Sequence, residues 1–193
     1  MRQLEEKILR DGRALNGDVL LVDSFLNNQV DAPLMAEVGK AFAGAAKDLG
    51  VTRVITIESS GIAPAMMTAM ALNVPLVILK KSTSRILKDD VLQTEVFSFT
   101  KNAAYQLTLK KRFVLPGDKV LLVDDFLARG EAAKGASHLI EQAGGSVTAI
   151  GIVIENSFQP GRALLTGKGY RIISLARVSK MGEGFIEFAE ADA

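Results

Sequence analysis

The string Val120-Leu-Leu-Val-Asp-Asp-Phe-Leu-Ala-Arg-Gly-Glu-Ala-Ala-Lys-Gly135 joins a short apolar run to two adjacent acids, a loop that contains glycine, and the start of a helix. A continuous apolar run of this kind is typical of a strand buried on both faces of a parallel sheet. The loop amides and the helix N-terminus that follow such a strand form an anion site, most often for phosphate. The string therefore predicts an α/β protein with a phosphate site beside its sheet.

The rest of the chain alternates strands and helices around this string. Strands are predicted over 53–57, 74–79, 119–123, 147–154 and 171–175, and helices over 2–10, 33–49, 64–72 and 131–143. Apolar strands separated by helices predict a central, mostly parallel sheet flanked by helices. Residues 91–114 depart from this pattern, because apolar residues alternate with polar ones on both sides of 101–104. That alternation predicts an antiparallel hairpin that projects from the sheet.

Composition narrows the class of protein. A chain of 193 residues predicts a single domain over 1–193. With 23 Lys+Arg against 22 Asp+Glu, the net charge of +1 argues against a nucleic-acid partner. The absence of cysteine excludes disulfides, thiolate catalysis and cysteine-ligated metals. The one histidine, His138, excludes paired-histidine metal motifs and is expected on the surface or partly buried in its helix.

Two segments bear on membranes and location. Residues 1–10 are charged throughout and have no apolar core of the signal-peptide type. The uncharged stretch 59–79 is long enough to span a bilayer. It contains Gly61, Pro64 and Pro75, however, and divides into a loop, a helix and a strand. We therefore expect a cytoplasmic protein with no membrane partner.

The adjacent acids Asp124 and Asp125 indicate more than a phosphate site. Two carboxylates would repel a phosphate at short range, so they must face hydrogen-bond donors or positive charge. A ribose beside its own 5′-phosphate meets this requirement, and a divalent ion would also fit. The alternative is an acidic strand end that caps a helix and binds no ligand. The complete order of strand, acids, glycine loop and helix favours the functional interpretation.

A second loop has the same design in Ile55-Thr-Ile-Glu-Ser-Ser-Gly-Ile-Ala-Pro64. The carboxyl ends of parallel strands converge on one crevice, where open α/β sheets bind ligands. Two anion sites on one crevice predict a substrate with phosphates at both ends. Taken alone, Ser-Ser-Gly before a proline is also an ordinary entry to a helix.

Five segments of the chain resemble a known family. Residues 120–132 resemble the phosphoribosyl pyrophosphate (PRPP) motif of type I phosphoribosyltransferases. Four further segments resemble the bacterial xanthine phosphoribosyltransferases: Val22-Asp-Ser-Phe-Leu-Asn27, Thr56-Ile-Glu-Ser-Ser-Gly-Ile-Ala-Pro64, Phe97-Ser-Phe-Thr-Lys101 and Gly151-Ile-Val-Ile-Glu-Asn-Ser-Phe-Gln-Pro-Gly-Arg162. The resemblance runs nearly end to end. It implies a small hood formed by about residues 1–32 and the C-terminal part, and a hairpin flap over about 80–114.

The resemblance also implies roles for individual residues. The 5′-phosphate would be held by Ala128, Arg129, Gly130, Glu131 and Ala132, and the pyrophosphate by Glu58, Ser59, Ser60 and Gly61. The purine would be contacted by Leu20, Asn27 and Asn156. Phe158 is our own addition, because its place beyond a strand end would let it stack on the purine.

The chemistry implied is transfer of ribose 5-phosphate from PRPP to xanthine, giving xanthosine 5′-monophosphate and pyrophosphate in purine salvage. Asp124 and Asp125 would stabilise the positive charge that develops on the sugar, and Lys80 or Lys81 would offset charge on the leaving group. Mg²⁺ would be held through pyrophosphate and ribose oxygens, with no dedicated protein metal site. Family members are expected to be homodimers.

Three departures from the family pattern affect which purine base we expect the protein to prefer. Asn156 stands where the xanthine enzymes carry a lysine, Arg129 and Glu131 stand where their phosphate loop is neutral, and Ser82 and Thr83 replace positive charge. Glu131 must therefore point away from the phosphate. These departures leave open a preference for guanine or hypoxanthine.

A regulator that senses PRPP without catalysis is the alternative from another class. About fifty residues before the first core strand are too few for a winged helix and a hood. Three other segments carry expectations of their own. Met66, Met67 and Met70 should pack in the core. Lys110-Lys-Arg112 should be a solvated strand end, and residues 80–90 should be mobile and take part in closing the site.

Overall fold

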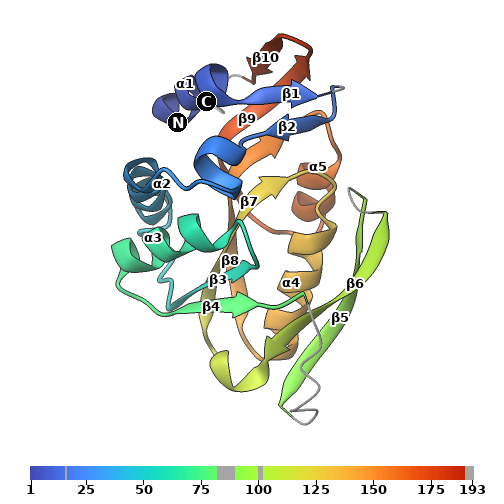
Figure 1. Cartoon of the computed structure of the whole chain (residues 1–193). Coiled ribbons are helices and arrows are strands. Elements are labelled where there is room, and N and C mark those ends of the chain that lie inside the picture. The colour runs from blue at the N-terminus through green and yellow to red at the C-terminus, as the bar shows by residue number, and fades with distance from the viewer. Residues whose placement is uncertain (16, 82–89, 100–101, 190–193) are drawn as a thin grey trace.

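A six-stranded sheet with the strand order β10-β9-β8-β7-β3-β4 forms the centre of the molecule (Figure 1). The computed structural model describes residues 1–15, 17–81, 90–99 and 102–189. The strands are β3 (Arg53–Ile57), β4 (Leu76–Leu79), β7 (Lys119–Leu127), β8 (Ser146–Asn156), β9 (Ile172–Gly182) and β10 (Phe185–Phe188). All neighbours pair in parallel except β10, which runs antiparallel to β9 at the edge. The predicted, mostly parallel sheet is confirmed.

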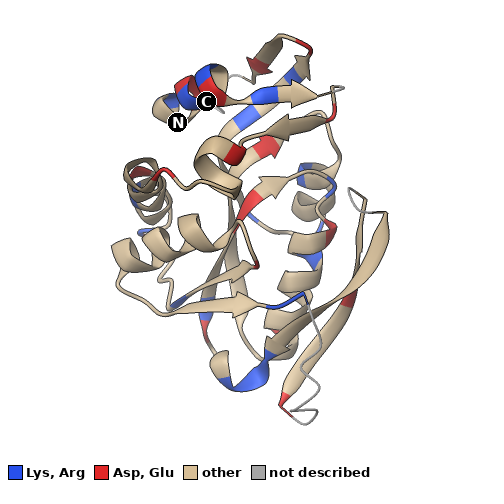
Figure 2. Cartoon of the chain, in the orientation of Figure 1, with Lys and Arg blue, Asp and Glu red and all other residues tan. Residues whose placement is uncertain are grey.

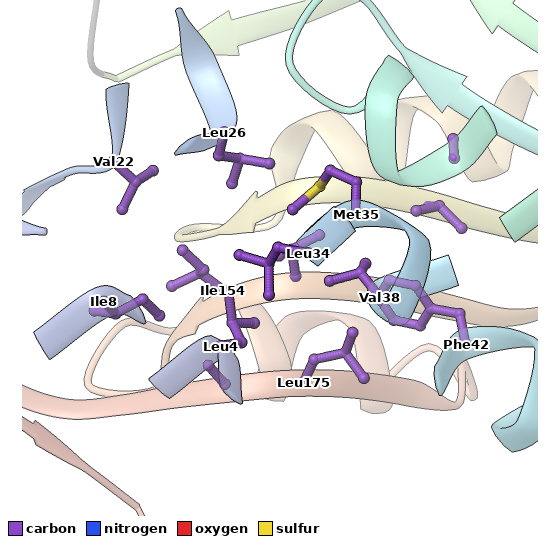
Figure 3. Packing of buried hydrophobic residues seen from close by; sticks show 14 of the residues in the cluster. Leu4, Ile8, Val22, Leu26, Leu34, Met35, Val38, Phe42, Ile154 and Leu175 are labelled. Atoms are coloured by element: carbon purple, nitrogen blue, oxygen red, sulfur yellow. The ribbon is translucent and has the colours of Figure 1, made fainter. Parts of the chain in front are cut away.

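Helices cover both faces of this sheet, which explains the apolar strands. One face is covered by α1 (Arg2–Asp11), α2 (Ala32–Ala45) and α3 (Ile62–Leu72), and the other by α4 (Glu131–Gln142). Side chains alternate along β7, so that Leu121 and Val123 join the first core cluster whereas Val120 and Leu122 join the second. In the first cluster, Leu4 of α1 and Phe42 of α2 come together with side chains of the sheet (Figure 3).

The N-terminal segment lies at the same end of the molecule as β10 (Figure 1). A short hairpin of β1 (Arg13–Leu15) and β2 (Val19–Leu21) follows α1, and a π-helical turn, η1 (Asp23–Asn27), leads on to α2. Lys7 of α1 forms a salt bridge of 2.9 Å with Asp31, the N-cap of α2. Charged residues of both signs lie along α1 (Figure 2).

The antiparallel hairpin predicted within 91–114 is confirmed. Strands β5 (Val91–Ser98) and β6 (Ala103–Lys110) pair over their full length. The hairpin packs on α4, where Gly135 permits the close approach, because a Cβ there would lie 2.6 Å from Cγ2 of Val96. The basic residues 110–112 end the hairpin at η2 (Lys111–Phe113), where Lys111 and Arg112 are exposed, as predicted (Figure 2). Of the segment 80–90, residues 82–89 lie outside the described residues.

The prediction that Met66 and Met70 pack in the core is wrong. Their side chains are 44% and 68% exposed, and only Met67 is partly buried. The buried face of α3 consists instead of small side chains, which let the helix lie close to α2. At Gly39 of α2, a Cβ would lie 2.5 Å from the carbonyl carbon of Met67. Because the two backbones approach so closely, the long methionine side chains at 66 and 70 point outward.

Several boundaries also differ from the predictions. Strand β7 continues to Leu127, so Asp124 and Asp125 lie on the strand and not after it. Helix α3 begins at Ile62, which makes Pro64 its third residue, and α5 (Gly161–Thr166) is an additional short helix. The stretch 59–79 forms a loop, α3 and β4, as predicted. Within the described ranges, no helix has the length and apolar character needed to cross a membrane.

Candidate active site

The carboxyl ends of β3, β7 and β8 border a cleft of about 1080 Å³. Both predicted anion loops reach this cleft, as does the hairpin. The predicted site residues that line it are Leu20, Glu58, Ser59, Ser60, Lys81, Asp124, Asp125, Ala128, Arg129, Gly130, Glu131, Ala132, Asn156 and Phe158. Gly61 and Asn27 lie next to it. A Cβ on Gly61 would lie 2.9 Å from Oδ1 of Asp124, and Nδ2 of Asn27 donates a hydrogen bond of 3.1 Å to Oδ2 of Asp125.

The loop between β7 and α4 is shaped to accept an anion. Gly130 has a φ of +84°, which favours glycine, and it directly precedes the first residue of α4. Across the described part of the chain, the backbone N–H groups of Arg129 and Gly130 donate to no protein acceptor. Free amides at a helix N-terminus attract negative charge. Glu131 does not oppose this, because its carboxylate forms a salt bridge of 3.0 Å with Lys134, one turn along α4.

The two adjacent carboxylates differ from an ordinary acidic surface. Asp124 is 8% exposed, and its Oδ1 accepts a hydrogen bond of 3.0 Å from the backbone N–H of Asp125. Burial, together with the negative charge of Asp125, raises the pKa of Asp124 well above its ordinary value. Among the described residues, neither acid has a salt bridge. The pair therefore has unused capacity to accept hydrogen bonds from a ligand.

The loop after β3 is the second predicted anion site. It includes a cis peptide bond between Glu58 and Ser59. Oε2 of Glu58 accepts a hydrogen bond of 2.8 Å from Nζ of Lys80, and Oε1 accepts one of 2.6 Å from the backbone N–H of Lys81. Although burial opposes ionisation, these two bonds lower the pKa of Glu58. The structure thus separates the two lysines, because Lys80 pairs with Glu58 whereas Lys81 lines the cleft.

The remaining wall of the cleft comes from β2, the end of β8 and the hairpin. Asn156 is 6% exposed, and its Oδ1 is buried without a hydrogen-bond partner. Phe158 follows it, with 41% of its surface exposed, and Leu20 of β2 also lines the cleft. An aromatic ring, an apolar side chain and an unpaired amide together suit a flat heterocycle with polar edges.

Sequence reasoning missed two contacts at this site. The guanidinium of Arg129 lies 4.3 Å from the ring centroid of Phe99, so the loop between β7 and α4 touches the tip of the hairpin. Tyr105 of β6 also lines the cleft, and burial together with the charge of Asp124 raises its pKa. The alternation in β6, which places Tyr105 on the same face as Leu107 and Leu109, was the available signal for Tyr105.

Acidic side chains at the cleft are also candidates for holding a metal ion. Within the described residues, no group of three or more His, Asp or Glu side chains could hold an ion. The carboxylates of Asp124 and Asp125 are nevertheless hard oxygen donors of the kind that Mg²⁺ prefers. The cleft therefore suits an ion that brings most of its ligands with the substrate.

Comparison with known families agrees with this geometry. Residues 28–162 match the family model described as the phosphoribosyl transferase domain. The chain therefore belongs to the phosphoribosyltransferase family, whose members are glycosyltransferases. Adenine phosphoribosyltransferase from Rhodothermus marinus has a similar fold, with a TM-score of 0.75, 22% identity, and coverage of 92% of this chain and 100% of that chain. The predicted type I phosphoribosyltransferase fold is confirmed.

Relatives of higher identity specify the branch of the family. Xanthine phosphoribosyltransferase 1 of Clostridium botulinum is 55% identical over 190 residues, covering 98% of this chain and 100% of the relative. Xanthine phosphoribosyltransferase of Streptococcus gordonii is 52% identical over 193 residues, covering 100% of both chains. The resemblance to the bacterial xanthine phosphoribosyltransferases is confirmed by these relatives.

Proposed function

We propose that this chain converts xanthine and PRPP to xanthosine 5′-monophosphate and pyrophosphate, a reaction of purine salvage. The observation that carries the proposal is that two anion loops, the Asp124–Asp125 pair, Asn156 and Phe158 all line one cleft. A ribose with phosphate groups at both ends would offer a phosphate to each anion loop and hydroxyls to the two carboxylates. The relatives named for xanthine support the choice of base.

In this proposal the phosphate loop, residues 128–132, holds the 5′-phosphate on its backbone amides, and residues 58–61 receive the pyrophosphate. A ring nitrogen of the base forms a bond to the anomeric carbon as the bond from that carbon to the pyrophosphate oxygen breaks. The electron pair of the broken bond leaves with pyrophosphate. Asp124 and Asp125 accept hydrogen bonds from the ribose hydroxyls and stabilise the positive charge that develops on the sugar. Catalysis is then mainly positioning and electrostatics.

The leaving group carries most of the negative charge in the cleft. Lys81 is the side chain placed to offset it, because Lys80 pairs with Glu58. Mg²⁺, held through pyrophosphate and ribose oxygens, would supply further positive charge when bound. Asp124 and Asp125 would lie close to that ion through the hydroxyls that they bind.

The base would lie between Phe158 and Leu20, with Asn156 at its edge. Asn27 would contact the base from the hood, and its hydrogen bond to Asp125 would hold its side chain beside the cleft. Residues 1–32 with the C-terminal part would serve as a hood over the base, and residues 80–114 as a flap that excludes water. The whole chain, 1–193, would act as one transferase domain.

Two further proposals concern the setting of the enzyme. The exposed side chains of Met66 and Met70 give α3 an apolar outer face, which supports a homodimer. PRPP, one of the two proposed substrates, is a phosphorylated anion that does not cross membranes unaided, which supports action in the cytoplasm. Sedimentation velocity at micromolar concentration tests the dimer, and a monomer at all concentrations would refute it.

Asn156 favours a second candidate, a preference for hypoxanthine or guanine. A neutral amide can donate one hydrogen bond and accept another, which matches the adjacent carbonyl and N–H of any 6-oxopurine. It offers no positive charge to the more acidic xanthine. Competition among the three bases in one reaction separates the candidates, since the preferred base is consumed first.

The experiment that tests the reaction class is pyrophosphate release from PRPP and Mg²⁺ in the presence and absence of a purine. An enzyme of this class releases pyrophosphate only when base is present. A PRPP sensor would bind PRPP by calorimetry and release none with any base.

A further inference from the structure

Glu155 is a buried acid next to the base-side wall, and the proposed chemistry does not use it. Its side chain is 1% exposed on β8, immediately before Asn156. Arg162 of α5 donates to both of its oxygens, with 2.8 Å from Nε to Oε1 and 2.6 Å from Nη2 to Oε2. Ser174 of β9 donates a third hydrogen bond to Oε2. Although burial opposes ionisation, the bonds from Arg162 and Ser174 lower the pKa of Glu155.

This ion pair brackets the segment that faces the base. Between Glu155 and Arg162 lie residues 156–161, which we call the base loop. Four of them line the cleft: Asn156, Phe158, Gln159 and Pro160. The bidentate pair joins the two ends of the base loop, so it fixes both their separation and their relative orientation.

The far end of the base loop also touches the phosphate loop. The backbone N–H of Gly161 donates a hydrogen bond of 3.0 Å to the carbonyl oxygen of Ala128. A Cβ on Gly161 would lie 2.4 Å from that oxygen, and a Cβ on Gly130 would lie 3.2 Å from the Cα of Gly161. The two loops are therefore in contact at glycines, and a displacement of α5 would move both.

We propose that Glu155 and Arg162 are positioning residues for the transferase reaction, because their ion pair fixes the base loop and, through Gly161, its contact with the phosphate loop. Stability alone is a weak reason for a buried ion pair, since the cost of removing two charges from water often equals the attraction between them. The planar fork of arginine specifies one orientation, which is what a wall shared by two subsites requires. The proposal rests on the proposed function for the identity of the two substrates.

The direct test is Arg162→Lys, which keeps the positive charge and removes the fork. We expect KM for the base to rise about tenfold and KM for PRPP about threefold, with an unchanged circular dichroism spectrum. The matched control is Arg53→Lys, in the Arg53–Asp118 pair (2.8 Å) at the amino ends of β3 and β7. Arg53→Lys should lower Tm by a similar amount and leave both constants within about twofold.

If Arg162→Lys lowers Tm as the control does and leaves both Michaelis constants within about twofold, the pair is only structural and the proposal is overturned. The KM of Arg162→Lys can also be measured for xanthine, guanine and hypoxanthine separately. A loss shared by all bases supports positioning of the whole loop.

A second variant tests the link between the loops. Gly161→Ala should raise KM for PRPP more than KM for the base, by about tenfold, because the added methyl displaces the carbonyl of Ala128. Gly167→Ala, just beyond the other end of α5, is the matched control and should change neither. Equal KM values for PRPP in Gly161→Ala and wild type would overturn the link.

The test also separates this proposal from the proposed function. If wild type releases no pyrophosphate with xanthine, guanine or hypoxanthine, the proposed function fails. Calorimetry with PRPP and Mg²⁺ then decides the positioning role. About threefold weaker binding in Arg162→Lys supports the role, and equal binding overturns it.

Discussion

Two buried aspartates stand near opposite ends of β7, and the protein surrounds them differently. Asp118 precedes the strand and Asp124 lies in its second half, and each is 8% exposed. Asp118 accepts hydrogen bonds from the backbone N–H of Leu115 (2.7 Å), Nε of Arg53 (2.8 Å) and Oγ1 of Thr52 (2.8 Å). These bonds lower its pKa although burial opposes ionisation. Asp124 accepts one bond from the adjacent backbone N–H, and its pKa is raised.

The difference separates a carboxylate with a structural role from one that is available to a ligand. At the amino end of β7, side chains and backbone of the protein donate the hydrogen bonds that the Asp118 carboxylate accepts. Toward the carboxyl end of β7, the Asp124 carboxylate is buried with one hydrogen bond, so it can accept further hydrogen bonds from a ligand. A poorly satisfied buried charge destabilises the empty protein, and such strain concentrates at functional sites.

The largest effect should come from exchanging these two carboxylates for amides. Asp124→Asn should lower kcat/KM about 10²–10³-fold, because it removes negative charge from beside the developing cation. The same substitution should raise Tm at pH values above the folded pKa of Asp124, since there it removes a poorly satisfied buried charge. Asp118→Asn should leave kcat/KM within about twofold and reduce the free energy of unfolding by about 2 kcal/mol. A fall in Tm for Asp124→Asn would contradict the comparison.

The pH dependence of stability should separate the same two residues. Because the pKa of Asp124 is raised on folding, its contribution is fully present below the ordinary carboxyl pKa and is lost as the pH rises through the folded pKa. Because the pKa of Asp118 is lowered, its contribution is present above the ordinary value and is lost as the pH falls through the folded pKa. In denaturant titrations from about pH 8 down to about pH 3, the free energy of unfolding of Asp124→Asn should therefore approach that of wild type from above. That of Asp118→Asn should stay below wild type and begin to approach it only at the acid end of the range.

Two glycines offer the next largest contrast. Gly130 and Gly117 have φ values of +84° and +87°, so alanine costs similar backbone strain at both. Only Gly130 is crowded, because its Cβ would lie 3.2 Å from Gly161, whereas nothing lies within 4 Å at Gly117. Gly130→Ala should raise KM for PRPP about tenfold, and Gly117→Ala should change stability alone. Equal KM values for the two variants would show that the phosphate loop tolerates the methyl.

A smaller effect is expected from Arg129, whose guanidinium stacks on Phe99. Arg129→Gln should raise KM for PRPP about threefold, because the stack holds the hairpin against the phosphate loop. Arg112 stacks on Phe113 at 5.0 Å, away from the cleft, and Arg112→Gln is the matched control. Steady-state kinetics in PRPP measure both variants. No difference between them would mean that the stack contributes nothing to substrate binding.

An effect of similar size should come from Asn156→Lys, and it concerns the base and not PRPP. The added positive charge should favour xanthine over hypoxanthine by about threefold in kcat/KM, because xanthine is the more acidic base. KM for PRPP should not change. Competition assays with both bases measure the ratio directly, and a shift toward hypoxanthine would contradict the assigned place of Asn156 at the base.

The two sides of the cleft also differ in how far the sequence predicts them. The strand, acids, glycine and helix of residues 120–135 are consecutive, so pattern alone placed the phosphate loop and the carboxylates. The base-side residues Leu20, Asn27 and Asn156 come from separate segments, and only resemblance to a family indicated them. No local pattern announces a pair such as Arg129 with Phe99, because such contacts depend on how distant elements pack. The error at Met66 and Met70 has the same origin, since helical spacing does not show which face another helix will approach.

Phosphoribosyl transfer to a 6-oxopurine can be tested directly with one assay. PRPP and Mg²⁺ are incubated with xanthine, guanine or hypoxanthine, and nucleotide formation is followed by ultraviolet absorbance in wild type and Asp124→Asn. We predict turnover with wild type, fastest for xanthine, and a loss of about 10²-fold or more in the variant. Tight binding of PRPP without turnover of any base would contradict the claim and identify the chain as a PRPP-binding protein without this activity.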